Sequence, residues 1–120
     1  MTRILAVDDS PSMRDTVRIS LNAAGFHVTA AGDGEEALAV ARKEPFDPVL
    51  SDVNMPQMNG IALIRALRAE AAYRHTPILM LTTESTAERK REGKDAGATG
   101  WIVKPFDPGQ LVATLRRVLR

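Results

Sequence analysis

A chain of 120 residues is long enough for one domain that buries about two-thirds of its unfolded surface. Its 16 basic and 15 acidic residues give a formal net charge of +1, which carries no signature of nucleic-acid or membrane binding. The absence of cysteine excludes disulfide frameworks and thiolate metal sites, and no apolar run approaches the roughly 20 residues that span a bilayer. We therefore expect one cytoplasmic domain over residues 1–120, with no signal peptide.

The first part of the chain predicts strands and helices in alternation. Residues 3–7 form a short apolar run, as buried parallel strands do. A helix follows the capping residue Ser10, has proline at its first position and ends at Gly25. Residues 27–30 alternate between polar and apolar, which indicates a half-exposed edge strand. The acidic segment 33–36 is typical of the start of a second helix.

The alternation continues through the middle of the chain. Pro45 ends the second helix, and a third strand is expected over residues 48–51. A third helix follows Asn59 and is expected to end around Tyr73. Residues 77–81 form the most hydrophobic run, which predicts a central strand.

The last part predicts a weak helix, a strand and a final helix. The helix expected over residues 86–96 has a thin apolar face and Gly93 in its interior, so we expect it to move most easily. Residues 100–103 form the fifth strand. The final helix begins after Asp107, with proline at its first position.

Strands that alternate with helices in this way predict an α/β domain of the (βα)5 type, with a doubly wound parallel five-stranded sheet. The carboxyl ends of parallel strands meet at one edge of the sheet, where ligands bind in such folds. Polar residues follow four of the five predicted strands at that edge: Asp8 and Asp9, then Asp52, Thr82 with Thr83, and Lys104.

These residue types indicate phosphoryl-transfer chemistry. Three carboxylates at one edge repel one another, and a bound Mg²⁺ would relieve the repulsion because it favours oxygen ligands. Asp52 directly follows a buried strand, so it could attack phosphorus and form an acyl phosphate. The ammonium group of Lys104 would then neutralise charge on the phosphoryl oxygens.

The pattern Asp8-Asp9, Asp52, Thr82 and Lys104-Pro105 resembles the receiver domain of two-component response regulators, and the resemblance covers the whole chain. It implies a flavodoxin-like fold with the strand order 2-1-3-4-5 and a single receiver domain over residues 1–120. It also implies that Asp52 is the phosphoacceptor. Mg²⁺ would be held by Asp8, Asp9, Asp52 and the backbone carbonyl of Asn54.

The resemblance assigns further roles at the same edge. Thr82 would hydrogen-bond a phosphoryl oxygen, and its spacing from Asp52 and Lys104 favours it over Thr83. Lys104 would pair with another phosphoryl oxygen, and the peptide bond between Lys104 and Pro105 would be cis. Asn54 and Glu84 correspond to the positions that tune how fast water removes the phosphoryl group.

Trp101 departs from the family pattern. The family commonly has tyrosine or phenylalanine three residues before the lysine, and this ring swings inward when the threonine moves toward the phosphate. The indole is larger, and its N–H needs a partner when it is buried. The sequence leaves open whether Trp101 acts as a switch residue or lies on the surface.

The family likeness implies a standalone phosphorelay switch, which catalyses only its own phosphorylation and dephosphorylation. A histidine kinase or phosphotransfer protein would supply the phosphoryl group. A protein target would bind the face formed by the fourth helix, fifth strand and fifth helix, with no direct contact to nucleic acid. We expect a monomer, and dimerisation on activation stays open.

Three other functions fit parts of the pattern. A Mg²⁺-dependent phosphohydrolase with an aspartyl-phosphate usually carries an Asp-x-Asp motif and a cap segment, neither of which the sequence predicts here. A flavin-binding electron carrier needs a hydroxyl-rich phosphate loop after the first strand. A phosphate-independent interaction domain typically lacks one of the acids or the lysine.

Overall fold

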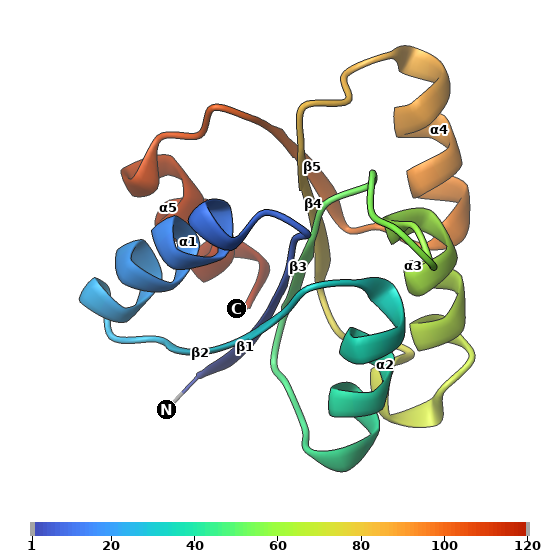
Figure 1. The fold of residues 1–120 in the computed structure, drawn as a ribbon, viewed down its shortest axis with the longest axis horizontal. Coiled ribbons are helices and arrows are strands. Elements are labelled where there is room, and N and C mark those ends of the chain that lie inside the picture. Colours follow the sequence, from blue (N-terminus) through green and yellow to red (C-terminus); the bar gives the residue numbers. More distant parts are fainter. Residues whose placement is uncertain (1, 120) are drawn as a thin grey trace.

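The computed structural model describes residues 2–119 and contains one parallel sheet of five strands (Figure 1). The sheet order is β2-β1-β3-β4-β5, which confirms the predicted flavodoxin-like topology. The strands are β1 (Arg3–Val7), β2 (His27–Ala31), β3 (Val49–Ser51), β4 (Ile78–Thr82) and β5 (Gly100–Val103). The helices are α1 (Pro11–Ala23), α2 (Gly34–Lys43), α3 (Gly60–Arg68), α4 (Ala87–Ala96) and α5 (Pro108–Val118), with a short 3₁₀ helix η1 (Ala71–Tyr73) after α3.

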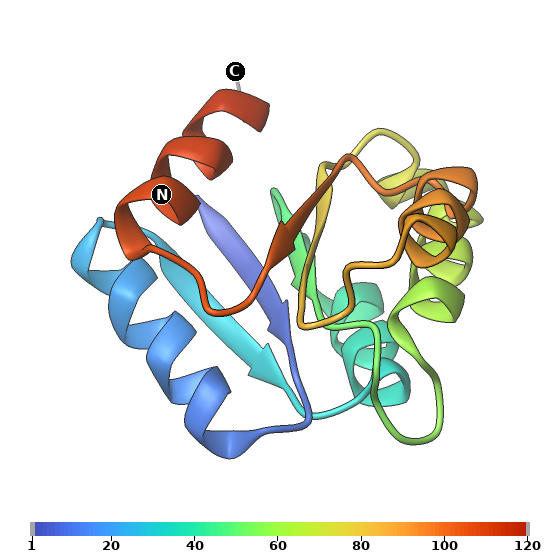
Figure 2. The ribbon, with the colours of Figure 1, turned by 90° about the horizontal axis from the view of Figure 1, so that it is seen from above.

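The helices form a layer on each face of the sheet. Helices α1 and α5 cover one face, and α2, α3 and α4 cover the other (Figures 1 and 2). Each face has its own hydrophobic cluster, and the two clusters take alternate residues of the central strands: Leu5 and Val7 point to one, Ile4 and Ala6 to the other. Strands buried on both faces explain the continuous apolar runs in the sequence.

The predicted helix caps are present. The side chain of Ser10 accepts a hydrogen bond from the backbone N–H of Met13, and Pro11 occupies the first helical position. Asp33 caps α2 in the same way, and Thr86, which was expected inside the fourth helix, instead caps α4. These caps fix where the loops at the carboxyl edge of the sheet end, because each satisfies an N–H that the helix itself leaves free.

The end of α3 differs from the prediction. The helix ends at Arg68, and η1 occupies the part that the sequence analysis assigned to the end of α3, around Tyr73. The guanidinium of Arg68 donates hydrogen bonds to the carbonyl groups of Tyr73 and Thr76, both at 2.7 Å. The Tyr73 hydroxyl donates to the carbonyl of Ala41 at 2.7 Å. These tertiary contacts stabilise a turn where local propensity allows the helix to continue.

The strand register places the candidate residues side by side. Val7 of β1 pairs with Ser51 of β3, so Asp8 and Asp52 leave the sheet at the same level. The backbone N–H of Asp52 donates to the carbonyl of Val7 at 3.0 Å, which continues the pairing by one residue. Within residues 2–119, no helix has the length and apolar character needed to cross a membrane.

Candidate functional site

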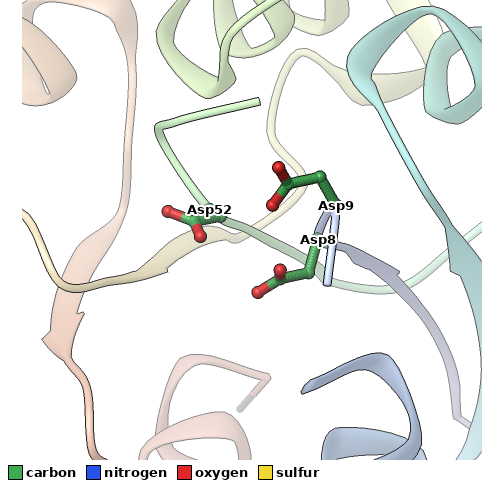
Figure 3. A group of neighbouring side chains, drawn as sticks. All are labelled: Asp8, Asp9 and Asp52. Atoms are coloured by element: carbon green, nitrogen blue, oxygen red, sulfur yellow. The ribbon is translucent and has the colours of Figure 1, made fainter. Parts of the chain in front are cut away.

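Three aspartates converge at the carboxyl edge of the sheet. Asp8 and Asp9 follow β1 and Asp52 follows β3, and one carboxylate oxygen of each lies within 4.8 Å of the others (Figure 3). Asp8 and Asp52 are buried, with 6% and 8% of their surface exposed, whereas Asp9 is exposed. The cluster is therefore buried at Asp8 and Asp52 and open to solvent at Asp9.

The Asp52 carboxylate is oriented by its own loop. Its Oδ1 accepts hydrogen bonds from the backbone N–H groups of Val53 at 2.6 Å and Asn54 at 3.3 Å. The start of α3 lies against the Asp52 backbone, since a Cβ on Gly60 would be 2.0 Å from the Asp52 carbonyl oxygen. Only glycine fits there, and it brings α3 close enough to hold Asp52 in place.

Lys104 connects the two buried carboxylates. Its Nζ lies 2.5 Å from Oδ2 of Asp8 and 3.0 Å from Oδ2 of Asp52, and its peptide bond to Pro105 is cis. Burial disfavours the charged form of the lysine, but hydrogen bonds and negative charge from both aspartates outweigh burial and raise the pKa of Lys104. The ammonium therefore stays protonated at neutral pH.

The donor set of the cluster fits Mg²⁺. All the candidate ligand atoms are carboxylate oxygens, and a hard divalent cation prefers such ligands and an incomplete protein cage. Three carboxylates face one ammonium group, so the cluster keeps an excess of negative charge that a cation would balance. The backbone carbonyl of Asn54 as a further ligand stays a prediction.

A chain of hydrogen bonds runs from this cluster toward α4 and passes through Glu84. The Asn54 side-chain amide donates to the Glu84 carboxylate at 3.2 Å. The backbone N–H of Glu84 donates to the hydroxyl of Thr82 at 3.1 Å, and Thr82 is fully buried. The backbone carbonyl of Glu84 accepts a hydrogen bond from the Trp101 indole N–H at 2.8 Å.

The Trp101 indole is half-buried and packs against the cluster of α2, α3 and α4. Its ring lies against Gly93 in the middle of α4, where a Cβ would be 2.6 Å from Cζ3 of the indole. The bond to Glu84 gives the N–H the partner that a buried indole needs. Trp101 is therefore a partly exposed residue whose ring packs against α4.

Comparison with known proteins agrees with this geometry. The family model for the response regulator receiver domain matches residues 4–116. The chain belongs to this family. Vibrio cholerae chemotaxis protein CheY4 has a solved structure that superposes with a TM-score of 0.95 and 55% sequence identity, covering 98% of each chain.

Relatives of about the same length and relatives of about twice the length are also similar to this chain. Chemotaxis protein CheY-3 of Vibrio cholerae is 42% identical over 117 residues, which are 97% of this chain and 90% of the relative. The DNA-binding response regulator MtrA of Mycolicibacterium smegmatis is 42% identical over 118 residues, and the chain spans about half of its length (50%). Receiver domains of this kind are signalling switches and not ordinary enzymes, and they interact with histidine kinases and targets.

The structure brings Asp8, Asp9, Asp52 and Lys104 together, and hydrogen bonds through Glu84 link Asn54, Thr82 and Trp101. It also shows contacts that the sequence did not predict. The sequence analysis missed Arg14, whose guanidinium donates a hydrogen bond to the backbone carbonyl of Asp8 at 2.7 Å. It treated Gly93 only as a helix-weakening residue and missed its contact with Trp101. The position of Arg14, one helical turn after the cap Ser10, could have marked it as close to the loop after β1. The sequence does not show that it binds the Asp8 carbonyl, because that contact depends on the conformation of the loop.

Proposed function

We propose that this receiver accepts a phosphoryl group on Asp52 and switches the affinity of its α4, β5 and α5 surface for a protein target. The observation that carries the proposal is the position of Asp52, a buried carboxylate within reach of Asp8, Asp9 and the Lys104 ammonium group. A phosphohistidine of a histidine kinase or of a phosphotransfer protein is the donor.

The reaction is a phosphoryl transfer between two protein groups. An oxygen of the Asp52 carboxylate forms a bond to phosphorus as the phosphorus–nitrogen bond of the donor breaks, and the freed histidine nitrogen takes up a proton. The product is an acyl phosphate on Asp52. When bound, Mg²⁺ supplies positive charge that balances the phosphoryl oxygens. Asp8, Asp9 and Asp52 are the side chains that would hold it.

Lys104 and Thr82 stabilise the phosphoryl group. The Lys104 ammonium exchanges one of its carboxylate contacts for a phosphoryl oxygen, at little cost because the group is already charged and positioned. The Thr82 hydroxyl accepts a hydrogen bond from Glu84, so its own proton is available for a second phosphoryl oxygen. Asn54 and Glu84 are joined by a hydrogen bond between their side chains, and this pair controls how easily water reaches phosphorus.

The same contacts couple the site to the target surface. Thr82 and Trp101 both bond to the backbone of Glu84, so a shift of Thr82 toward the phosphoryl group displaces the segment that holds the indole. Trp101 lines a groove of about 230 Å³ on the side of α4: Lys90, Lys94, Ala98, Thr99 and Gly100 are its other residues. Phosphate contacts made only in the active form supply the bias between the two conformations.

Intact mass spectrometry tests the acceptor. Incubation with Mg²⁺ and a small phosphodonor such as acetyl phosphate is expected to add one phosphoryl group to the wild-type protein, and Asp52→Asn is expected to remain unmodified. Asp95→Asn is the matched control, since Asp95 is an exposed aspartate of α4, and it is expected to be modified like the wild type. Equal uptake by Asp52→Asn would exclude Asp52 as the acceptor.

Fluorescence of Trp101, the sole tryptophan, tests the switch in the same samples. A change in emission that accompanies the mass gain indicates coupling between Asp52 and Trp101. A mass gain with constant fluorescence would keep the acceptor and reject Trp101 as part of the switch. Failure of the wild type to gain mass from a competent donor would favour a phosphate-independent interaction domain.

A further inference from the structure

Arg14 makes a contact that the phosphoacceptor mechanism leaves unexplained. The residue lies in the second turn of α1 and is half-buried, and its guanidinium donates to the backbone carbonyl of Asp8 at 2.7 Å. The guanidinium fits against Gly32 in the loop after β2, where a Cβ would be 3.3 Å from the guanidinium nitrogen. Arg14 thus joins the loop after β1 to the loop after β2.

Helix α1 itself gives this cation no electrostatic stabilisation. The N-terminus of a helix carries partial positive charge, so a cation near it is disfavoured and an acid is preferred. The first turn of α1 contains no acidic residue. The hydrogen bond to the Asp8 carbonyl is therefore the polar contact that places the guanidinium, which indicates that Arg14 acts on the loop and not on the helix.

The Asp8 carbonyl belongs to the peptide unit that joins Asp8 to Asp9. A peptide unit is planar, so a group that fixes its carbonyl also fixes the direction in which the chain continues at Asp9. The Asp8 side chain has its own partners, because Oδ1 accepts from the Ser10 N–H at 2.9 Å and Oδ2 accepts from Lys104. Asp9 is different: its exposed carboxylate makes no hydrogen bond within residues 2–119, so its position depends on the backbone.

We propose that Arg14 is a positioning residue for the metal ligands, which strengthens Mg²⁺ binding by fixing the peptide unit between Asp8 and Asp9. The inference rests on the proposed metal site. Groups that orient metal ligands from outside the coordination sphere, such as the carboxylates that bond to histidine ligands, typically contribute about 10- to 100-fold to metal affinity. We expect the same order of effect from Arg14.

The sign of the effect separates positioning from simple electrostatics. Arg14 is a cation beside a cation site, so charge alone predicts that its removal strengthens Mg²⁺ binding. Positioning predicts the opposite, because a free peptide unit must be ordered again each time the metal binds. The two explanations therefore give opposite shifts for the same substitution.

A Mg²⁺ titration of the wild type, Arg14→Ala, Arg14→Lys and Arg18→Ala tests the inference, with the backbone amide resonances of Val53 and Asn54 as the readout. These amides donate to the Asp52 carboxylate and report on metal binding without any phosphodonor. We expect Arg14→Ala to weaken Mg²⁺ binding about tenfold. Arg14→Lys keeps the charge and one donor, so its affinity is expected to lie between that of the alanine variant and that of the wild type.

Arg18→Ala is the matched control, because Arg18 is an exposed arginine one turn further along α1 that pairs with Asp15. Its affinity for Mg²⁺ is expected to equal that of the wild type. Equal or tighter Mg²⁺ binding by Arg14→Ala than by the wild type would overturn the inference. If the alanine variant does not fold, equal or tighter binding by Arg14→Lys would overturn it instead. A wild-type protein that does not respond to Mg²⁺ would overturn the metal site itself, and the role of Arg14 with it.

Discussion

Helices α3 and α4 are neighbours on the same face of the sheet, yet they are attached to it in different ways. Helix α3 buries five of its nine residues: Gly60, Ile61, Leu63, Ile64 and Leu67. Helix α4 buries only Gly93 and Ala96 of its ten residues. Because burial of apolar side chains supplies most of the stability of a packed helix, α3 is fixed to the core and α4 is weakly held.

Each helix also contacts the site through a glycine. Gly60 at the start of α3 touches the backbone of Asp52, and Gly93 in the middle of α4 touches the ring of Trp101. The rigid helix therefore supports the acceptor, and the weakly held helix contacts the residue proposed to report on it. A switch needs both, since a fixed acceptor and a segment with low local stability allow a small change at the site to alter a distant surface.

Truncation of the α3 core is expected to have the largest effect. Ile64 is fully buried, so Ile64→Ala removes buried methyl groups and leaves a cavity, at a cost of about 3–4 kcal/mol in unfolding free energy. Urea denaturation measures the loss. Arg91→Ala on the exposed face of α4 is the control, with an expected change within about 0.5 kcal/mol. Similar changes for the two variants would contradict the conclusion that the buried side chains of α3 fix it to the core.

Arg68 provides a polar link between the ends of the two helices. Its guanidinium donates to the carbonyl of Gly97, the capping residue of α4, at 2.8 Å, as well as to the residues that follow α3. Arg68→Ala leaves several half-buried carbonyl groups without this donor, which is expected to cost about 2 kcal/mol. Native-state hydrogen exchange is expected to rise more in the last turn of α4 than in α3.

Arg65→Ala gives the comparison for that prediction. Arg65 lies in α3 one turn before Arg68 and is exposed, so its substitution removes the same charge without removing carbonyl contacts. We expect nearly unchanged stability and exchange. Equal effects of the two substitutions would mean that charge, and not the link from Arg68 to Gly97, holds the end of α4.

The parts of the fold set by local sequence were predictable. Apolar runs gave the strands, and caps such as Ser10 and Asp33 gave the helix starts, because both depend on residues near in the chain. The convergence of Asp8 and Asp52 was predictable for a topological reason, since parallel strands in this order bring their carboxyl ends to one edge.

What the sequence did not predict depends on side chains that reach across the structure. The end of α3 was placed around Tyr73 because its residues allow a helix, whereas Arg68 bonds to the distant carbonyl of Gly97 and Tyr73 to that of Ala41, and these contacts stop the helix earlier. Propensity identified Gly93 as a weak point of α4, but the reason for a glycine there is the indole of Trp101, which no local pattern encodes.

Gly93→Ala is expected to have the smallest effect on stability and the most informative effect on Trp101. Alanine favours the helix by about 1 kcal/mol over glycine. Its Cβ would lie 2.6 Å from Cζ3 of the indole, so the ring must shift and its hydrogen bond to Glu84 weakens, which costs about as much. The unfolding free energy is then expected to change by less than about 1 kcal/mol.

Tryptophan fluorescence separates these two opposing effects. A displaced ring is more exposed, so Gly93→Ala is expected to shift the emission of Trp101 to longer wavelength and to increase its quenching by iodide, while Arg91→Ala on the same helix leaves both unchanged. An unchanged spectrum together with the full helix stabilisation would mean that α4 moves away from the sheet to accommodate the methyl group. In that case the weak attachment of α4, and not the packing of the indole against Gly93, determines how the α4, β5 and α5 surface responds.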